Sequence, residues 1–196
     1  EFGLEGMKVA LVARGVEALE ECARELREDT GGDFISIIAD TGDPESVTAM
    51  VKEAAEKLGR IDILVNSAAR VGGAYTPKLA EITEDDFWGD MNTKVMGYLR
   101  CAQAVAPYMI DQGWGRVINV ASIAGLQGGQ YMAAYSASKH AQVGFTRALA
   151  AEVADQGVTA NTICPGYVDT AMADYAVNRI VGKTERKSTR LNSSHW

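Results

Sequence analysis

Five runs of apolar, mostly β-branched residues alternate with stretches of helical spacing, and this alternation constrains the fold more than any other feature. The expected strands are residues 8–13, 34–39, 61–66, 117–121 and 158–164. The expected helices are residues 16–28, 44–58, 83–110 and 134–154. Such alternation predicts a doubly wound α/β fold, a parallel sheet with helices on both faces. Ligands in such sheets bind beyond the carboxyl ends of the strands, so candidate site residues are sought directly after each strand.

Charge and cysteine content narrow the class of protein. The formal net charge of −7 opposes binding to nucleic acid phosphates or to an acidic membrane surface. No apolar run approaches the roughly 20 residues that cross a bilayer, and residues 1–5 lack the features of a secretory signal. Cys22, Cys101 and Cys164 lie far apart without a Cys-x-x-Cys pair. We therefore expect no metal site, no disulfide framework and a cytoplasmic location.

A tyrosine and a lysine stand four positions apart in the expected helix 134–154. Tyr135 and Lys139 therefore share one helix face, and a nearby ammonium lowers the pKa of a phenol from its ordinary value near ~10. Such a phenol can exchange a proton with a carbonyl or alcohol oxygen near neutral pH. Ser122 directly follows the strand 117–121 and could hydrogen-bond the same oxygen. Taken alone, the Tyr-x-x-x-Lys pair is a weak indication, because chance supplies many of them.

The surrounding motifs occur in the order and spacing of a known family. Residues 59–66 (GRIDILVN), 118–125 (INVASIAG) and 161–170 (NTICPGYVDT) resemble the central strand, the serine strand and the nicotinamide-side loop of the short-chain dehydrogenase/reductase family. Within that family, the chain resembles members similar to 3-oxoacyl-(acyl-carrier-protein) reductases. The resemblance implies a Rossmann-like fold and a small-molecule substrate. It also implies NAD(P)(H)-dependent hydride transfer between a carbonyl and a secondary alcohol.

The resemblance also assigns roles to individual residues. Ser122 would orient the carbonyl, Tyr135 would be the general acid or base, and Lys139 would bind the nicotinamide ribose and lower the pKa of Tyr135. Further cofactor contacts would come from Arg14, Asp40, Asn66, Pro165, Gly166, Val168 and Thr170.

Two of these cofactor residues have equally simple structural alternatives. Asp40 matches the family's adenine contact, but the sequence of residues 40–43 (DTGD) is also good turn chemistry. Arg14 stands where a cation can pair with a 2′-phosphate, although it could also be an ordinary exposed residue at a helix start. We expect NADP(H) to be favoured and NAD(H) to be possible.

The opening of the chain departs from the family. Residues 3–12 resemble the family's start up to its Gly-rich turn, whereas residues 13–21 resemble the segment after its second strand. One opening βα unit is therefore missing, and Gly15 is the only glycine between Gly6 and Gly31. Closely spaced glycines let a backbone approach a pyrophosphate. We expect a deletion, a mis-spliced form or an assembly error at the seam, and poor nucleotide binding.

The other end departs as well. A family member would continue past Met172 into a substrate-covering segment and a last strand, whereas residues 187–195 resemble the translation of a sequencing-library adapter. We expect one truncated domain over residues 1–182 and a non-native, disordered tail over residues 183–196. The substrate therefore stays open among 3-oxoacyl thioesters, small ketones and secondary alcohols.

The family's fourth catalytic residue is also replaced. An asparagine belongs 28 residues before the serine, where this chain has Lys94. Lys94 could take over a proton relay, or its side chain could extend to solvent. Asn92 is a poor substitute, because two helical residues at this spacing differ in direction by about 160°.

Two rival functions are weighed against an oxidoreductase. The main alternative to an enzyme is a non-catalytic fragment or a dinucleotide-responsive binding module of the same fold. A hydrolase reading of the Ser-x-x-Lys at residues 136–139 lacks the companion Ser-Asp-Asn and Lys-Thr-Gly elements. Family members form homodimers or homotetramers through the two long helices, here residues 83–110 and 134–154.

Overall fold

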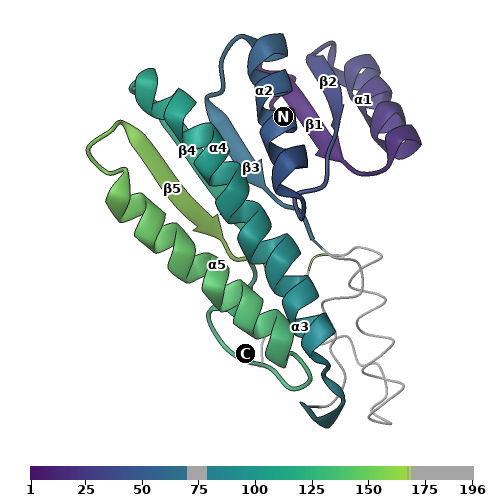
Figure 1. The fold of residues 1–196 in the computed structure, drawn as a ribbon. Helices are drawn as coiled ribbons and strands as arrows, with labels where there is room; N and C mark the ends of the chain where they lie inside the picture. Colours follow the sequence, from purple (N-terminus) through teal and green to yellow (C-terminus); the bar gives the residue numbers. More distant parts are fainter. Residues whose placement is uncertain (70–78, 167, 169–196) are drawn as a thin grey trace.

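The computed structural model describes residues 1–69, 79–166 and 168, and its elements follow the expected order (Figure 1). The strands are β1 (Lys8–Ala13), β2 (Asp33–Ile38), β3 (Ile63–Asn66), β4 (Gly115–Val120) and β5 (Val158–Ile163). The helices are α1 (Val16–Thr30), α2 (Pro44–Leu58), α3 (Glu84–Asp90), α4 (Gly97–Asp111) and α5 (Ala133–Glu152). Short 3-10 turns are η1 (Leu79–Glu81) and η3 (Ile123–Gly125), and η2 (Met91–Met96) is a π-helical turn. The five expected strands are confirmed, although β3 begins two residues later than expected.

The strands form two parallel sheets within the described residues. β1 pairs with β2 from Lys8↔Asp33 to Ala13↔Ile38. β3, β4 and β5 form the second sheet in that order, with β4 in the middle. The sequence predicted parallel strands, and this is confirmed. It did not predict that the sheet divides between β1 and β3, next to the place where a strand was expected to be missing.

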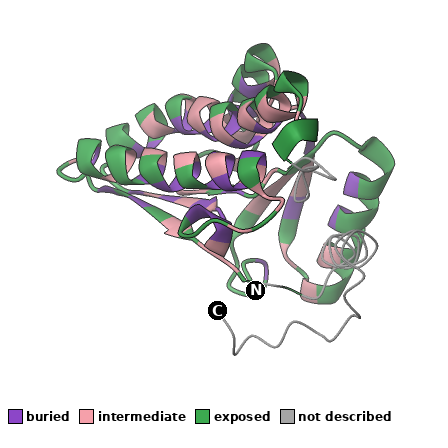
Figure 2. Ribbon diagram, turned by 90° about the horizontal axis from the view of Figure 1, so that it is seen from below, coloured by how far each residue is buried: buried purple, intermediate pink, exposed green. Residues whose placement is uncertain are grey.

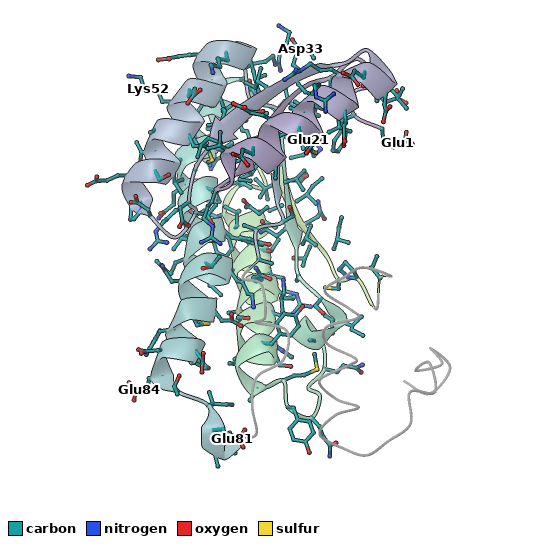
Figure 3. The ribbon with its side chains drawn as sticks, turned by 90° about the vertical axis from the view of Figure 1, so that its right-hand side faces the viewer. Glu1, Glu21, Asp33, Lys52, Glu81 and Glu84 are labelled. Carbon is teal, nitrogen blue, oxygen red and sulfur yellow. The ribbon has the colours of Figure 1, made fainter. Side chains whose placement is uncertain are left out.

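Among the described residues, helices cover both faces of the sheet of β1 and β2 and one face of the sheet of β3 to β5. Figure 3 shows α1, marked by Glu21, and α2, marked by Lys52, on different sides of β1 and β2. α4 and α5 cover one face of the second sheet (Figure 1). The buried residues gather where these helices meet the strands (Figure 2). One apolar core joins the parts, with members in β2, α2, α4, β4 and β5. Each fully buried aliphatic side chain contributes roughly 1.5–3 kcal/mol.

Local sequence sets the ends of the helices as predicted. Asp43 caps α2, its Oδ1 accepting from the N–H of Glu45 at 3.0 Å, and Pro44 occupies the first turn. Gly59 ends α2 with φ of 82°, a conformation that favours glycine. Thr83 caps α3 by accepting from the N–H of Asp86 at 3.1 Å.

The long helix predicted over residues 83–110 is continuous but not regular. The N–H of Gly97 donates to the carbonyl of Asn92, five residues back, which is the π-helical pattern of η2. A Cβ on Gly97 would lie 3.0 Å from Thr41 Oγ1, so the helix packs tightly against the loop that follows β2. The side chains of Asn92 and Arg100 donate to the carbonyls of Gly42 and Thr41, each at 3.2 Å. This clamp ties the β1–β2 part to the rest of the molecule.

Within the described residues, none of the helices combines the length and the apolar character needed to cross a membrane. Three expectations from the sequence lie outside the described residues: the contact by Thr170, the missing last strand and the non-native tail over residues 183–196.

Candidate active site

The carboxyl ends of β3, β4 and β5 meet at one edge of their sheet. Asn66 pairs in register with Asn119, and Val120 pairs with Ile163. The side-chain amide of Asn66 donates to Asn119 Oδ1 at 2.9 Å, and that of Asn119 donates to Thr146 Oγ1 at 2.8 Å. All three side chains are buried, so the network fixes the edge of the sheet to α5. Asn66 therefore has a structural partner besides any contact with a cofactor.

Ser122 stands immediately beyond β4, where the chain turns into η3. Its backbone is extended, and its hydroxyl oxygen accepts from the N–H of Ala124 at 3.2 Å. The N–H of Ile123 donates to the carbonyl of Pro165 at 3.0 Å, which joins this turn to the loop after β5. A Cβ on Gly125 would lie 2.7 Å from the Lys139 carbonyl oxygen, so glycine is needed for η3 to approach α5 closely. These contacts hold Ser122 against the start of α5.

Tyr135 and Lys139 share the face of α5 that looks toward this turn. Lys139 is 4% exposed, and its ammonium donates to the carbonyl of Val120 at 3.0 Å. The same ammonium lies 5.7 Å from the centroid of the Tyr135 ring. The Ser122 side chain lies near enough to Tyr135 to act on the pKa of its phenol. The structure thus brings together the three residues that the sequence predicted as a catalytic group.

Burial controls the proton affinities of this group. It raises the pKa of Tyr135 above its ordinary value, an effect opposed by the Ser122 side chain and reinforced by the Asp90 carboxylate. Burial, and then repulsion by Lys94, lowers the pKa of Lys139 to about 8, while Asp90 and Cys164 act to raise it. The expectation that Tyr135 would have a lowered pKa is therefore wrong for the chain in this state, because removal from water outweighs the effect of Ser122 and the Asp90 carboxylate adds to the rise.

Lys94 is buried in the same region, which sequence reasoning left undecided. Its side chain is 1% exposed and pairs with Asp90, with 2.6 Å between Nζ and Oδ2. Its ammonium lies 4.8 Å from the centroid of the Tyr135 ring. Extension to solvent is excluded by this burial. Asn92 instead contacts Gly42, as its direction on the helix predicted.

Sequence reasoning missed Asp90, Tyr98 and Gln142. Tyr98 is 1% exposed and its hydroxyl donates to the carbonyls of Ala68 and Val120, at 3.3 and 3.2 Å. Burial is the main cause of its raised pKa. An acid four residues before Lys94 was a readable signal for an i,i+4 ion pair. Nothing in the sequence pointed to Tyr98 or Gln142, because they contact the backbone of distant segments.

Arg14 and Asp40 form their own pair just past the carboxyl ends of β1 and β2. Their charged atoms lie 3.8 Å apart, with side chains 71% and 48% exposed. Asp40 Oδ1 also accepts from the N–H of Gly42 at 2.8 Å, so the turn alternative is observed. α1 begins at Val16, and the N-cap residue before it, Gly15, has φ of −88° and makes no side-chain cap. A Cβ on Gly15 would meet nothing within 4 Å, so no close backbone approach uses this glycine.

The remaining predicted contacts lie in the loop after β5. Pro165 is partly buried, and its carbonyl accepts the hydrogen bond from Ile123. Gly166 is exposed, and a Cβ there would meet nothing within 4 Å. Val168 is 57% exposed. Within the described ranges, no cluster of three histidine, cysteine or acidic side chains could hold a metal ion.

Comparison with known proteins places these features in context. A family model described as short chain dehydrogenase matches residues 1–180. A Streptomyces coelicolor protein whose name assigns it as a ketoacyl reductase is 42% identical over 175 residues, 88% of this chain and 65% of that protein. A 3-oxoacyl-(acyl-carrier-protein) reductase from Synechocystis sp. is 34% identical over 170 residues, 86% of this chain and 67% of its own length.

A solved structure agrees with these relatives. The crystal structure of an actinorhodin polyketide ketoreductase variant with NADPH superposes with a TM-score of 0.89 and 36% identity, covering 95% of this chain and 70% of that one. The chain spans 61% to 65% of the length of three Streptomyces relatives that it matches.

Proposed function

The chain belongs to the short-chain dehydrogenase family, and from this we propose that it is an NAD(P)(H)-dependent oxidoreductase that interconverts a carbonyl and a secondary alcohol. The observation that carries the proposal is the gathering of Ser122, Tyr135 and Lys139 at the carboxyl end of β4. Lys139 is held on the carbonyl of Val120 beside the Tyr135 ring, and Ser122 lies near enough to Tyr135 to act on the pKa of its phenol.

Each of the three residues has a distinct role in the proposal. In the reducing direction Tyr135 donates the proton of its hydroxyl to the substrate oxygen, which becomes an alcohol. The phenolate left behind is stabilised by the Lys139 ammonium. Ser122 hydrogen-bonds the same substrate oxygen and orients the carbonyl. The nicotinamide, when bound, supplies or accepts the hydride.

We further propose that the nicotinamide end of the cofactor lies beside Lys139, whose ammonium contacts the ribose. The residues proposed to complete the cofactor site are Arg14, Asp40, Asn66, Pro165, Gly166, Val168 and Thr170. NADP(H) is favoured, because the ketoreductase structure at 36% identity was solved with NADPH and Arg14 offers a cation for a 2′-phosphate. NAD(H) is the alternative, since Arg14 already pairs with Asp40.

The described residues fit the nicotinamide end of the cofactor and not its pyrophosphate. The turn from β1 into α1 holds only Arg14 and Gly15, and Gly15 makes no close backbone approach. A pyrophosphate cradle needs closely spaced glycines at such a turn. We therefore expect this chain to bind NADPH weakly. Low-micromolar affinity in isothermal titration calorimetry would contradict that expectation.

The test of function is reduction of an acetoacetyl thioester, followed by nicotinamide absorbance. We would compare the chain as it is with a variant carrying a Gly-rich βα unit inserted between Val12 and Ala13. In whichever form is active, Tyr135→Phe should lower kcat by roughly 10²–10⁴-fold. Tyr108→Phe is the matched control, because Tyr108 lies on α4 with 41% of its surface exposed. Equal kcat values for the Tyr135→Phe and Tyr108→Phe variants would refute the role of Tyr135.

A second candidate function rests on the divided sheet. If the restored variant and the chain as it is both fail to turn over, a non-catalytic fragment or a dinucleotide-responsive binding module becomes the better description. The two can be separated by whether NADPH raises the melting temperature of the chain, since a ligand that binds only the folded state stabilises it.

Four organisational features belong to the same proposal. Residues 1–182 would form one domain, and residues 183–196 would be a non-native tail. The protein would be cytoplasmic and would associate as a homodimer or homotetramer through the long helices over residues 83–110 and 134–154. Sequencing the source locus past residue 182 tests the tail, and light scattering tests the association.

A further inference from the structure

A buried ion pair lies directly behind the proposed general acid. Lys94 and Asp90 are 1% and 2% exposed, and 2.6 Å separates Nζ from Oδ2. Asp90 Oδ1 has no hydrogen-bond partner within the described residues. Removing two charges from water costs several kcal/mol per ion, so a buried pair is weak support for stability by itself. A pair in this place therefore calls for a reason other than stability.

The backbone around the pair is fixed by a second buried side chain. The amide of Gln142 on α5 donates to the carbonyl of Lys94 at 2.7 Å, inside the π-helical turn η2. Gln142 has no exposed surface. Single π-helical turns occur frequently at functional sites. Because α5 also carries Tyr135 and Lys139, this bond sets the position of the ion pair relative to both.

The resulting geometry places two ammonium groups against one phenol. Lys94 Nζ lies 4.8 Å from the centroid of the Tyr135 ring, closer than Lys139 Nζ at 5.7 Å. Unit charges a few ångströms apart in a protein interior interact by several kcal/mol, even at an effective dielectric constant of about 20. Lys94 therefore repels the Lys139 ammonium, and the Asp90 carboxylate opposes that repulsion.

We propose that Asp90 and Lys94 are a positioning pair for Tyr135 and Lys139, in which Lys94 holds a second positive charge on the phenol and Asp90 keeps Lys139 protonated beside it. Its functional meaning rests on the proposed function, but the electrostatic claim does not. Other groups also act on the two residues that the pair positions: Tyr98 on α4 and Ser122 after β4 interact with Tyr135, and Cys164 after β5 interacts with Lys139.

The proton affinities of the group agree with this arrangement. Lys94 acts to lower the pKa of Lys139, and Asp90 acts to raise it. Asp90 also raises the pKa of Tyr135. The two partners therefore act in opposite directions on Lys139, and the place of the Lys94 ammonium over the Tyr135 ring predicts the same opposition there. Removing them one at a time should produce opposite results.

The experiment titrates Tyr135 and Lys139 by NMR in the cofactor-free chain, with ¹³C labels at tyrosine Cζ and lysine Cε. Tyr135→Phe and Lys139→Arg assign the two signals. Asp90→Asn should lower both pKa values by about one pH unit, because it removes a negative charge that opposes the effect of Lys94. Lys94→Met should raise both by a similar amount. The double variant should return both close to the wild-type values.

The chain offers a matched control. Lys57 and Glu53 form an i,i+4 pair with the same 2.6 Å separation, but their side chains are 50% and 44% exposed. Lys57→Met and Glu53→Gln should leave the Tyr135 and Lys139 signals unchanged, because solvent screens the exposed pair.

The outcomes decide the matter whether or not each variant folds. Shifts of the same sign in the two single variants, or shifts no larger than in the control, overturn the proposal. If Lys94→Met does not fold, the direction of the Asp90→Asn shift decides. If neither single variant folds, the double variant decides, and a change in either pKa beyond the control overturns it. Because no cofactor or turnover is needed, failure here is distinguishable from failure of the proposed function.

Discussion

Packing differs between two regions of the molecule. The region of β1, α1 and β2 is loosely packed, and the region of β3 to β5 with α4 and α5 is well packed. β1 has no buried residue and leaves Val12 40% exposed, and α1 buries only Leu19 and Ala23. β4, by contrast, is paired on both sides and alternates buried with half-buried positions. The residues proposed for proton transfer belong to the second region. The pyrophosphate end of a cofactor would fall to the first.

The contacts between the regions explain how one can be loosely packed while the other is well packed. They meet through the loop after β2, which Asn92 and Arg100 clamp, and through packing of α2 on α4. No strand pairing joins them within the described residues. The difference teaches that the geometry around Tyr135 does not depend on a continuous sheet. It depends on contacts among α5, η2, η3 and the ends of β3 to β5.

The largest expected effect on stability comes from a substitution in the apolar core of the well-packed region. Met109→Ala removes a side chain with no exposed surface that packs among α4, β4 and β5. The free energy of unfolding should fall by about 2–5 kcal/mol, as for other buried methionines. Urea denaturation measures it. A loss below about 1 kcal/mol would mean that the side chains of the well-packed region are less tightly packed than their burial indicates.

The next effect concerns the buried charge. The pKa of Lys139 is lowered to about 8 in the folded chain from an ordinary 10.5. Between these values Lys139 binds more protons in the unfolded chain, so its contribution to the free energy of unfolding should rise with pH, by up to about 3 kcal/mol. The raised pKa of Cys101 opposes this rise above about pH 9, so the contribution of Lys139 is read from the difference between the wild type and a variant without it.

Denaturation at a series of pH values from about 8 to 10 measures that rise. Lys139→Met should flatten the dependence. An equal slope in the wild type and in this variant would place its origin elsewhere in the molecule.

A smaller effect is expected from the close approach of η3 to α5. Gly125→Ala would put a Cβ 2.7 Å from the Lys139 carbonyl oxygen and 2.9 Å from its carbon. We expect a loss of about 1–3 kcal/mol, the usual cost of overpacking. The melting temperature reports this loss, and Gly128→Ala serves as control because a Cβ there meets nothing within 4 Å. Equal melting temperatures for the two variants would contradict the close approach.

The smallest effect on stability is expected in the loosely packed region of β1, α1 and β2. Val12→Ala shortens a side chain that is 40% exposed in β1, so the free energy of unfolding should change by no more than about 0.5 kcal/mol. The same denaturation experiment applies. A loss above about 2 kcal/mol would mean that the outer side of β1 is packed against something, and the contrast between the regions would then fail.

Local patterns predicted much of the fold and of the site. Apolar runs located all five strands, and the helix expected over residues 44–58 matches α2, because the end signals of Asp43, Pro44 and Gly59 act within a few residues of themselves. The motifs around Ser122, Tyr135 and Lys139 predicted a group that the structure does bring together. The direction of Asn92 was also predictable from helix geometry.

The features that the sequence did not predict depend on contacts between distant segments or on burial. The division between β1 and β3 is a matter of which strands pair. The raised pKa of Tyr135 comes from burial, whereas the sequence showed only the nearby lysine. The fate of Lys94 depended on Asp90 and on the Gln142 bond from another helix.

The π-helical turn η2 also bears on how this chain tolerates insertions and deletions. Such a turn holds one residue more than an α-helical turn would, with the N–H of Gly97 reaching back to Asn92. Losing one residue here would restore a regular helix instead of breaking it. Since each residue turns an α-helix by about 100°, α3 would then rotate about its axis relative to α4. Asp90 would leave the interior while the rest of the fold was preserved. Two coding sequences that differ by one codon in this turn would therefore encode proteins that are equally helical but differ in the charge buried beside Tyr135.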